Sequence, residues 1–192
     1  MKTKTQKLTL TAVLTALAIV LSFVKLWEMP LGGSITLGSM LPVMLVSIVL
    51  GVKWGLASGA VFATFQLVQA LASANVFPYC ETGLTLTVCV LFDYVVPFAL
   101  IGLAGAFRGV SIGRLHNAGA YLGIFLVCLI RFLSHFITGV AIWGQWAPDG
   151  MGKYLYSLLY NGGYMLPELG ISLLLAVLIL ETPATKRLLS RK

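Results

Sequence analysis

Six apolar runs constrain the fold of this chain more than any other feature. A helix that spans a bilayer needs about 20 apolar residues. The segments between the runs are rich in glycine, proline and charged residues. The runs cover approximately residues 8–26, 34–50, 54–72, 84–107, 118–143 and 156–180. We therefore expect an all-α membrane protein, a bundle of six transmembrane helices.

The composition supports one integral-membrane domain over residues 1–192. The chain is 59% hydrophobic and 10% charged, and its mean hydropathy is +0.97. A soluble domain has roughly 25% charged residues. The net charge is +7, but the basic residues lie at the ends of the apolar runs rather than in one patch. That distribution is typical of membrane proteins and argues against nucleic acid as a partner.

The positions of lysine and arginine predict how the chain is oriented in the bilayer. Cytoplasmic loops of membrane proteins carry an excess of basic residues. With a cytoplasmic N-terminus, Lys25 and Lys153 lie outside and Arg131 lies within the fifth run. The remaining basic residues are then cytoplasmic: Lys2, Lys4, Lys7, Lys53, Arg108, Arg114, Lys186, Arg187, Arg191 and Lys192. Both termini are therefore expected in the cytoplasm, with the longer loops outside.

Ionisable residues inside the apolar runs indicate a binding site. They are Asp93, Arg131, His135 and Glu168. Such side chains are costly in a membrane and usually mark functional positions. At 1.5 Å of rise per helical residue, Asp93, His135 and Asn161 lie at similar depths, roughly 8–14 Å below the outer surface. We expect these side chains to converge on one cavity that opens to the outside.

Helical spacing places more polar and aromatic groups beside these residues. Arg131 and His135 are four residues apart and share a helix face. Asn161, Tyr164 and Glu168 follow an i, i+3, i+7 stripe. Nearby indole and phenol rings offer π faces that suit a cationic or aromatic ring. The pattern predicts a small heteroaromatic ligand with a positive charge.

Structural roles compete with this interpretation. Asp93 and Arg131 could form a buried ion pair that serves only the fold. His135 could be a satisfied core residue, and the outer tryptophans could belong to an interfacial aromatic belt. Glu168 is the deepest of the group and is equally compatible with a structural role. The clustering of all these residue types at one depth favours a binding site.

The polar segments of this chain resemble the thiamine-specific S-components (ThiT type) of energy-coupling factor (ECF) vitamin transporters. The similarity covers nearly the whole chain. It is strongest in residues 91–97, 131–143 and 154–162, and residues 29–34 resemble the first outer loop of the family. The resemblance implies six spans with both ends in the cytoplasm of a prokaryotic cell. It also implies high-affinity binding of thiamine from outside the plasma membrane.

The resemblance carries specific binding positions onto this sequence. The matching residues are Asp93, Tyr94, His135, Trp143, Tyr156 and Asn161. The acidic position is glutamate in other members, and the shorter aspartate is expected to alter affinity more than specificity. Family members can use a tryptophan of the first outer loop as a lid, for which Trp27 is the candidate here. Arg131, Tyr164 and Glu168 are further candidates from their spacing and depth.

The resemblance also implies partners and a transport mechanism. A membrane coupling subunit and two ATPases would drive reorientation of the loaded protein and release of thiamine inside. Ala12 and Ala16 form a small-residue strip that another helix can approach closely, and they are implied to dock on the coupling subunit. The chain has no GxxxxGK[ST] phosphate loop. We therefore expect no cofactor on this chain, because the partner subunits use the ATP.

The same residues bear on three other functions. An enzyme is disfavoured, because Ser134 and His135 point about 100° apart on a helix and no HExxH or cysteine metal motif is present. A stand-alone proton-coupled thiamine carrier stays open, with His135 and Asp93 as its coupling residues, although no internal repeat is evident. An S-component for riboflavin or a pyrimidine precursor also stays open. Asp93 beside aromatic rings favours a cationic thiazolium over an uncharged flavin.

Overall fold

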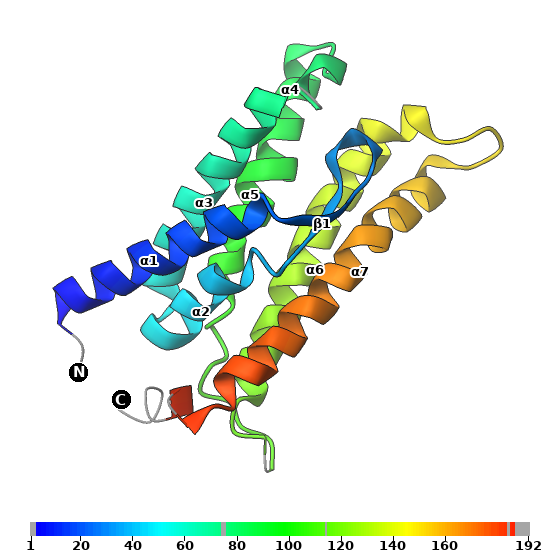
Figure 1. Ribbon diagram of the computed structural model, residues 1–192. Helices are drawn as coiled ribbons and strands as arrows, with labels where there is room; N and C mark the ends of the chain where they lie inside the picture. Colours follow the sequence, from blue (N-terminus) through cyan, green and yellow to red (C-terminus); the bar gives the residue numbers. More distant parts are fainter. Residues whose placement is uncertain (1–2, 74–75, 114, 184, 187–192) are drawn as a thin grey trace.

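The computed structural model describes residues 3–73, 76–113, 115–183 and 185–186 as a bundle of tilted helices (Figure 1). The α-helices are α1 (Lys4–Ser22), α2 (Leu41–Leu50), α3 (Val52–Ser73), α4 (Gly83–Cys89), α5 (Val96–Ala99), α6 (Ala118–Ala141) and α7 (Lys153–Leu180). Shorter turns are the 3-10 segments η1 (Pro30–Gly32), η2 (Phe77–Tyr79), η4 (Leu100–Leu103) and η5 (Trp143–Trp146) and the π-helical segment η3 (Val90–Val95). Lys2, Arg114, Arg187, Arg191 and Lys192, which enter the orientation argument, lie outside the described residues.

Five helical segments in the described ranges are long and apolar enough to cross a membrane. They are α1, α3, α6, α7 and the continuous segment Gly83–Leu103, which joins α4, η3, α5 and η4. Helix α2 is also apolar but has only 10 residues. The predicted all-α membrane fold is therefore confirmed.

The second predicted run contains a helix only in its later part. Residues 34–36 form strand β2 (Ser34–Thr36), which pairs with β1 (Lys25–Glu28) in an antiparallel hairpin. Gly38 has a φ of +70°, a left-handed conformation that a helix cannot continue through. Pro42 lies in the first turn of α2, where its missing N–H costs no hydrogen bond. Helix α2 therefore begins at Leu41 and is too short to span a bilayer unaided.

The fourth run is interrupted by a π-helical turn around Asp93. The N–H of Val96 bonds to the carbonyl of Leu91, five residues earlier. Pro97 follows directly and has no N–H to donate. A π-turn carries an extra residue and is common at functional sites. Here it lies next to the cavity described below, with the Asp93 side chain buried.

Small residues let α3 lie directly on the segment that follows η3. Gly55 packs against the backbone of Gly102, and Gly59 packs against the carbonyl of Ala99. A side chain at Gly55 would collide with that backbone. Gly55 and Gly59, which are four residues apart, therefore serve close packing inside the bundle.

Figure 1 places the start of α1 and the end of α7 in the lower part of the bundle. The connections from α3 to α4 and from α6 to α7 lie at the upper end. The β1–β2 hairpin crosses beside α6 and α7. The two ends of the described helical chain are thus on one side of the molecule. Which side faces the cytoplasm stays a prediction.

Candidate functional site

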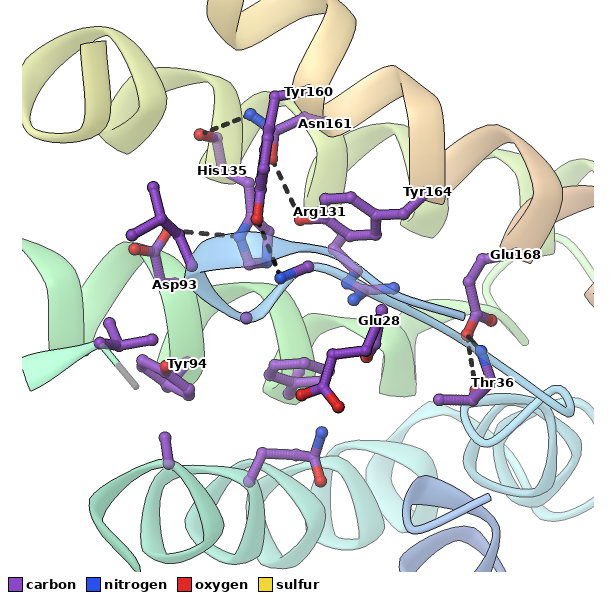
Figure 2. A pocket seen from close by; sticks show the side chains of 18 of the residues that line it. Glu28, Thr36, Asp93, Tyr94, Arg131, His135, Tyr160, Asn161, Tyr164 and Glu168 are labelled. Carbon is purple, nitrogen blue, oxygen red and sulfur yellow. Dashed lines mark hydrogen bonds and ion pairs between the residues drawn. The ribbon is translucent and has the colours of Figure 1, made fainter. Parts of the chain in front are cut away.

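A cavity of about 180 Å³ lies among α3, η3, α6, α7 and the β1–β2 hairpin (Figure 2). Side chains that the sequence singled out line this cavity: Asp93, Tyr94, Arg131, His135, Trp143, Tyr156, Asn161, Tyr164 and Glu168. They come from η3, α6, η5 and α7, which are distant in the sequence. The structure therefore brings these residues together, and their role in ligand binding stays a prediction.

Four side chains contact the carboxylate of Asp93. Its Oδ1 accepts a hydrogen bond from Thr138 Oγ1 and lies 3.2 Å from Nδ1 of His135. Its Oδ2 accepts from Nε1 of Trp143 at 3.0 Å and from Sγ of Cys89 at 3.5 Å. Only 6% of the residue is exposed. Four donors thus fix the direction of this carboxylate at one end of the cavity.

His135 has one ring nitrogen engaged and one free. Because Nδ1 faces the Asp93 carboxylate, it carries the hydrogen in the neutral ring, which leaves Nε2 as an acceptor. Within the described residues, Nε2 is buried without a hydrogen-bond partner. The pair therefore presents an acceptor that a ligand amino or hydroxyl group can use.

Arg131 does not pair with Asp93, so the ion-pair alternative is wrong. Its Nη1 lies 3.2 Å from Sδ of Met40. The guanidinium carbon is 5.0 Å from the ring centre of Phe98 and 5.8 Å from that of Tyr164. Aromatic faces attract a cation at these distances. They hold Arg131 in the middle of the cavity wall, between Asp93 and Glu168 in Figure 2.

The Asn161 side chain on α7 forms a hydrogen bond to α6. Its Nδ2 donates to the carbonyl oxygens of His135, at 3.2 Å, and Ser157, at 3.0 Å. Its Oδ1 accepts from the hydroxyl of Tyr164 at 3.0 Å. The amide hydrogens are therefore already used by the protein. A ligand contact at Asn161 would have to use the second lone pair of Oδ1.

Two residues of α7 hold the β1–β2 hairpin against the bundle. Oε1 of Glu168 accepts from the backbone N of Thr36 at 2.6 Å and from its Oγ1 at 2.5 Å. The hydroxyl of Tyr160 accepts from the N–H of Gly33 at 3.0 Å and donates to the carbonyl of Pro30. Glu168 is only 2% exposed. It has a structural contact to the hairpin and a second oxygen, Oε2, without a partner among the described residues.

Trp27 does not line the cavity. It is 65% exposed, and its strand neighbours Lys25 and Glu28 line the cavity instead. The pairing of β1 with β2 shifts register between Lys25 and Trp27. Such a bulge changes which residues share a face of the strand. The expectation that Trp27 closes the site is not met in this conformation.

Some polar residues of the site were not predicted. Gln66 of α3 lines the cavity, and its Oε1 is buried without a partner in the described part of the chain. Thr138 donates to Asp93. Thr138 continues the i, i+4, i+7 stripe of Arg131 and His135. That stripe, and the rarity of a glutamine within a membrane span, are signals that could have identified both residues.

Residues 8–188 match the sequence family described as "Thiamine transporter protein". The chain belongs to this family. The thiamine transporter ThiT of Bacillus subtilis (strain 168) is 32% identical over 182 residues, which cover 90% of this chain and 89% of that protein. The ThiT of Lacticaseibacillus paracasei is 35% identical over 82 residues, 38% of this chain and 40% of that protein.

A solved structure shares the architecture described above. ThiT from Listeria monocytogenes superposes with a TM-score of 0.73, at 23% identity, over 95% of this chain and 96% of that chain. At this identity the likeness supports the fold. The relatives of this thiamine transporter family member are named as transporters rather than enzymes, which confirms that the chain is not an enzyme. Family and helices together make it a multi-pass membrane protein.

Proposed function

We propose that this chain binds thiamine in the cavity around Asp93 and serves as the substrate-specific subunit of an ECF-type vitamin transporter. The observation that carries the proposal is the 32% identity to a thiamine transporter over 90% of the chain. The predicted binding residues surround one cavity in that same chain. Thiamine is a small heteroaromatic cation, which is the ligand that the side chains of this cavity favour.

The charge of the cavity suits a cation. Three carboxylates, those of Glu28, Asp93 and Glu168, line it against two basic side chains, Lys25 and Arg131. With the histidine neutral, one formal negative charge is left over. In a low-dielectric site an uncompensated charge is costly. A monovalent cationic ligand would balance it.

The cavity offers two kinds of contact to a ligand, aromatic stacking and hydrogen bonding. The indole of Trp143 and the rings of Tyr94 and Tyr156 face the cavity, so they can stack on or enclose an aromatic cation. We assign Asp93 to the charged or amino-bearing part of the ligand. Nε2 of His135 accepts from a ligand N–H or O–H group.

The surface of α1 is compatible with docking to a coupling subunit. Ala12 and Ala16 are exposed, whereas Thr11 and Thr15 on the same helix are buried. Oγ1 of Thr15 lies 2.7 Å from Oγ of Ser58 in α3. The alanine face therefore points away from the bundle. We propose that it packs on a membrane coupling subunit that works with two ATPases.

We place the protein in the plasma membrane of a prokaryotic cell, with both termini in the cytoplasm. The excess of basic residues in the segments on that side supports this orientation. The cavity lies beside the hairpin and the upper loops, so it would open to the outside. The bilayer, thiamine, the coupling subunit and the ATPases are the proposed partners.

Tryptophan fluorescence during a thiamine titration of the purified protein tests the binding proposal. Trp143 lines the cavity, so a ring bound nearby should change its emission. We expect saturable quenching at submicromolar thiamine that is lost in His135→Ala. Riboflavin and pyridoxal are the controls. A response to one of these, without a response to thiamine, would overturn the choice of vitamin.

A proton-coupled carrier that works alone is the second candidate. The observation that favours it is the buried contact between Nδ1 of His135 and Oδ1 of Asp93, 3.2 Å apart, which joins two groups able to exchange a proton. Thiamine uptake by cells that contain this chain without coupling and ATPase subunits decides between the two. Uptake under those conditions would support the carrier, and its absence would support the ECF-type subunit.

A further inference from the structure

Two cysteines lie together beside the Asp93 end of the cavity. Cys80 follows η2 and is partly exposed, whereas Cys89 ends α4 and is 0% exposed. Burial raises the pKa of the Cys80 thiol, and the neighbouring Cys89 side chain partly offsets this rise. Cys80 also packs against the buried cluster that contains Cys89 and Ile142. The third cysteine, Cys128, belongs to the central core cluster in α6.

The cysteine pair is connected directly to the cavity. Sγ of Cys89 donates to Oδ2 of Asp93 at 3.5 Å, and the same oxygen accepts from Nε1 of Trp143 at 3.0 Å. Val76, which precedes η2 and Cys80, lines the cavity and belongs to the same buried cluster. A change at the thiol pair therefore reaches both the Asp93 carboxylate and the loop before α4.

We propose that Cys80 and Cys89 are a redox-active pair whose reversible disulfide controls the Asp93 end of the cavity. The inference about ligand affinity rests on the proposed binding of thiamine. The inference that the disulfide forms does not depend on it.

The chemistry requires a disulfide-bearing oxidant, either a small-molecule disulfide or a thiol–disulfide oxidoreductase. The thiolate of Cys80, the more exposed residue, attacks one sulfur of the oxidant and releases the other as a thiolate. The thiolate of Cys89 then attacks the sulfur of Cys80 and releases the second thiolate. The protein loses two electrons and two protons, and the oxidant becomes two thiols.

Burial around the loop affects how quickly this exchange runs. Desolvation raises the pKa of the Cys80 thiol, so less thiolate is present at neutral pH than for an exposed cysteine. Exchange should therefore be slow near neutrality and faster in alkaline buffer.

The disulfide would change the cavity in two ways. It removes the thiol hydrogen that Cys89 donates to Asp93, so the carboxylate keeps fewer of its donors. It also joins Cys80 covalently to the end of α4. Because one hydrogen bond to the ligand-facing carboxylate is lost, we expect thiamine affinity to fall about fivefold.

Mass spectrometry of the intact protein tests whether the disulfide forms. Purified Cys128→Ser protein, which keeps the pair, is incubated with oxidised glutathione in alkaline buffer and compared with the double variant Cys80→Ser, Cys128→Ser. We expect the first protein to lose about 2 Da and both of its reactive thiols, and peptide mapping to join Cys80 to Cys89. Two thiols that stay free, or that carry only glutathione, would overturn the proposal.

Thiamine titration of the same proteins tests the effect on the cavity. Oxidised Cys128→Ser protein should bind about fivefold more weakly than its reduced form, and reduction with a phosphine should restore binding. The double variant should bind equally before and after the same treatment. Equal affinity of the oxidised and reduced forms would overturn control of the cavity. If the reduced protein does not bind thiamine, the proposed function fails. The mass measurement still shows whether the disulfide between Cys80 and Cys89 forms.

Discussion

Asp93 is a membrane-embedded carboxylate that, among the described residues, is contacted by several donors but by no lysine or arginine side chain. Thr138, His135, Trp143 and Cys89 donate to it or face it. Donors of this kind stabilise an ionised carboxylate and leave its charge for a ligand.

Asp93→Asn should weaken thiamine binding at least tenfold, because a charge-assisted interaction with the cation is replaced by a neutral one. The asparagine amide has the shape of the carboxylate, so folding should persist. Isothermal titration calorimetry measures the affinity. Asp149→Asn is the matched control, because it removes a carboxylate from the connection between η5 and α7, and Asp149 does not line the cavity. Equal affinities of Asp93→Asn and the control would make Asp93 a purely structural residue.

The β1–β2 hairpin is the element that covers one side of the cavity. Its loop and strand are held to α7 by Tyr160 and Glu168 (Figure 2). These contacts connect a short two-stranded element, which would be marginal alone, to a long helix. The rate at which a ligand leaves should therefore depend on them.

Tyr160→Phe should accelerate thiamine dissociation by about tenfold. The variant keeps the ring but lacks the hydroxyl that bonds to Gly33 and Pro30. Stopped-flow fluorescence with excess unlabelled competitor measures the rate. Tyr154→Phe, on an exposed part of the same helix, should leave the rate unchanged. A Tyr160→Phe rate equal to that of the Tyr154→Phe control would mean that the hairpin contacts do not retain the ligand.

The contact of α3 with the segment after η3 has no room for a side chain at Gly55. Gly55→Ala should destabilise the folded protein by about 1–3 kcal/mol, because the added methyl group meets the backbone of Gly102. Thermal unfolding in detergent, followed by circular dichroism, measures the change. A methyl group at Gly170 of α7 would have open space, so Gly170→Ala should keep or raise the melting temperature of the parent protein. Equal melting temperatures for both variants would contradict the packing argument.

At the scale of the whole molecule, the cavity and the exposed face of α1 use different surfaces. The cavity is bounded by α3, η3, α6, α7 and the hairpin, whereas Ala12 and Ala16 face outward from α1. Binding of the ligand and docking on a partner should therefore be separable by mutation.

Ala16→Trp should abolish thiamine uptake by cells while purified protein binds thiamine within about twofold of the parent, because a bulky ring prevents close approach of a partner helix. Uptake of radiolabelled thiamine measures transport by cells, and a thiamine titration measures binding by the purified protein. Leu178→Trp, an exposed position on α7, should preserve both. Normal uptake by Ala16→Trp would remove the proposed docking role of this face.

The sequence alone determined the class of this protein and the residue types of its site. Apolar length identifies membrane helices because the bilayer sets a minimum span, so five of the expected spans correspond to long apolar helical segments. The cost of ionisable groups in a membrane singled out Asp93, Arg131, His135 and Glu168, all of which line the cavity.

Only the tertiary structure decided how those residues are partnered. Hydropathy alone does not show that residues 34–50 contain strand β2 before helix α2. The helix begins only at Leu41 because of the backbone conformations at Gly38 and Pro42, and hydropathy does not report backbone conformation. Spacing along one helix cannot show that Asp93 bonds to Trp143 and Thr138 rather than to Arg131, since those contacts join different elements. The bulge that turns Trp27 away from the cavity arises from strand pairing, which exists only once the hairpin has folded.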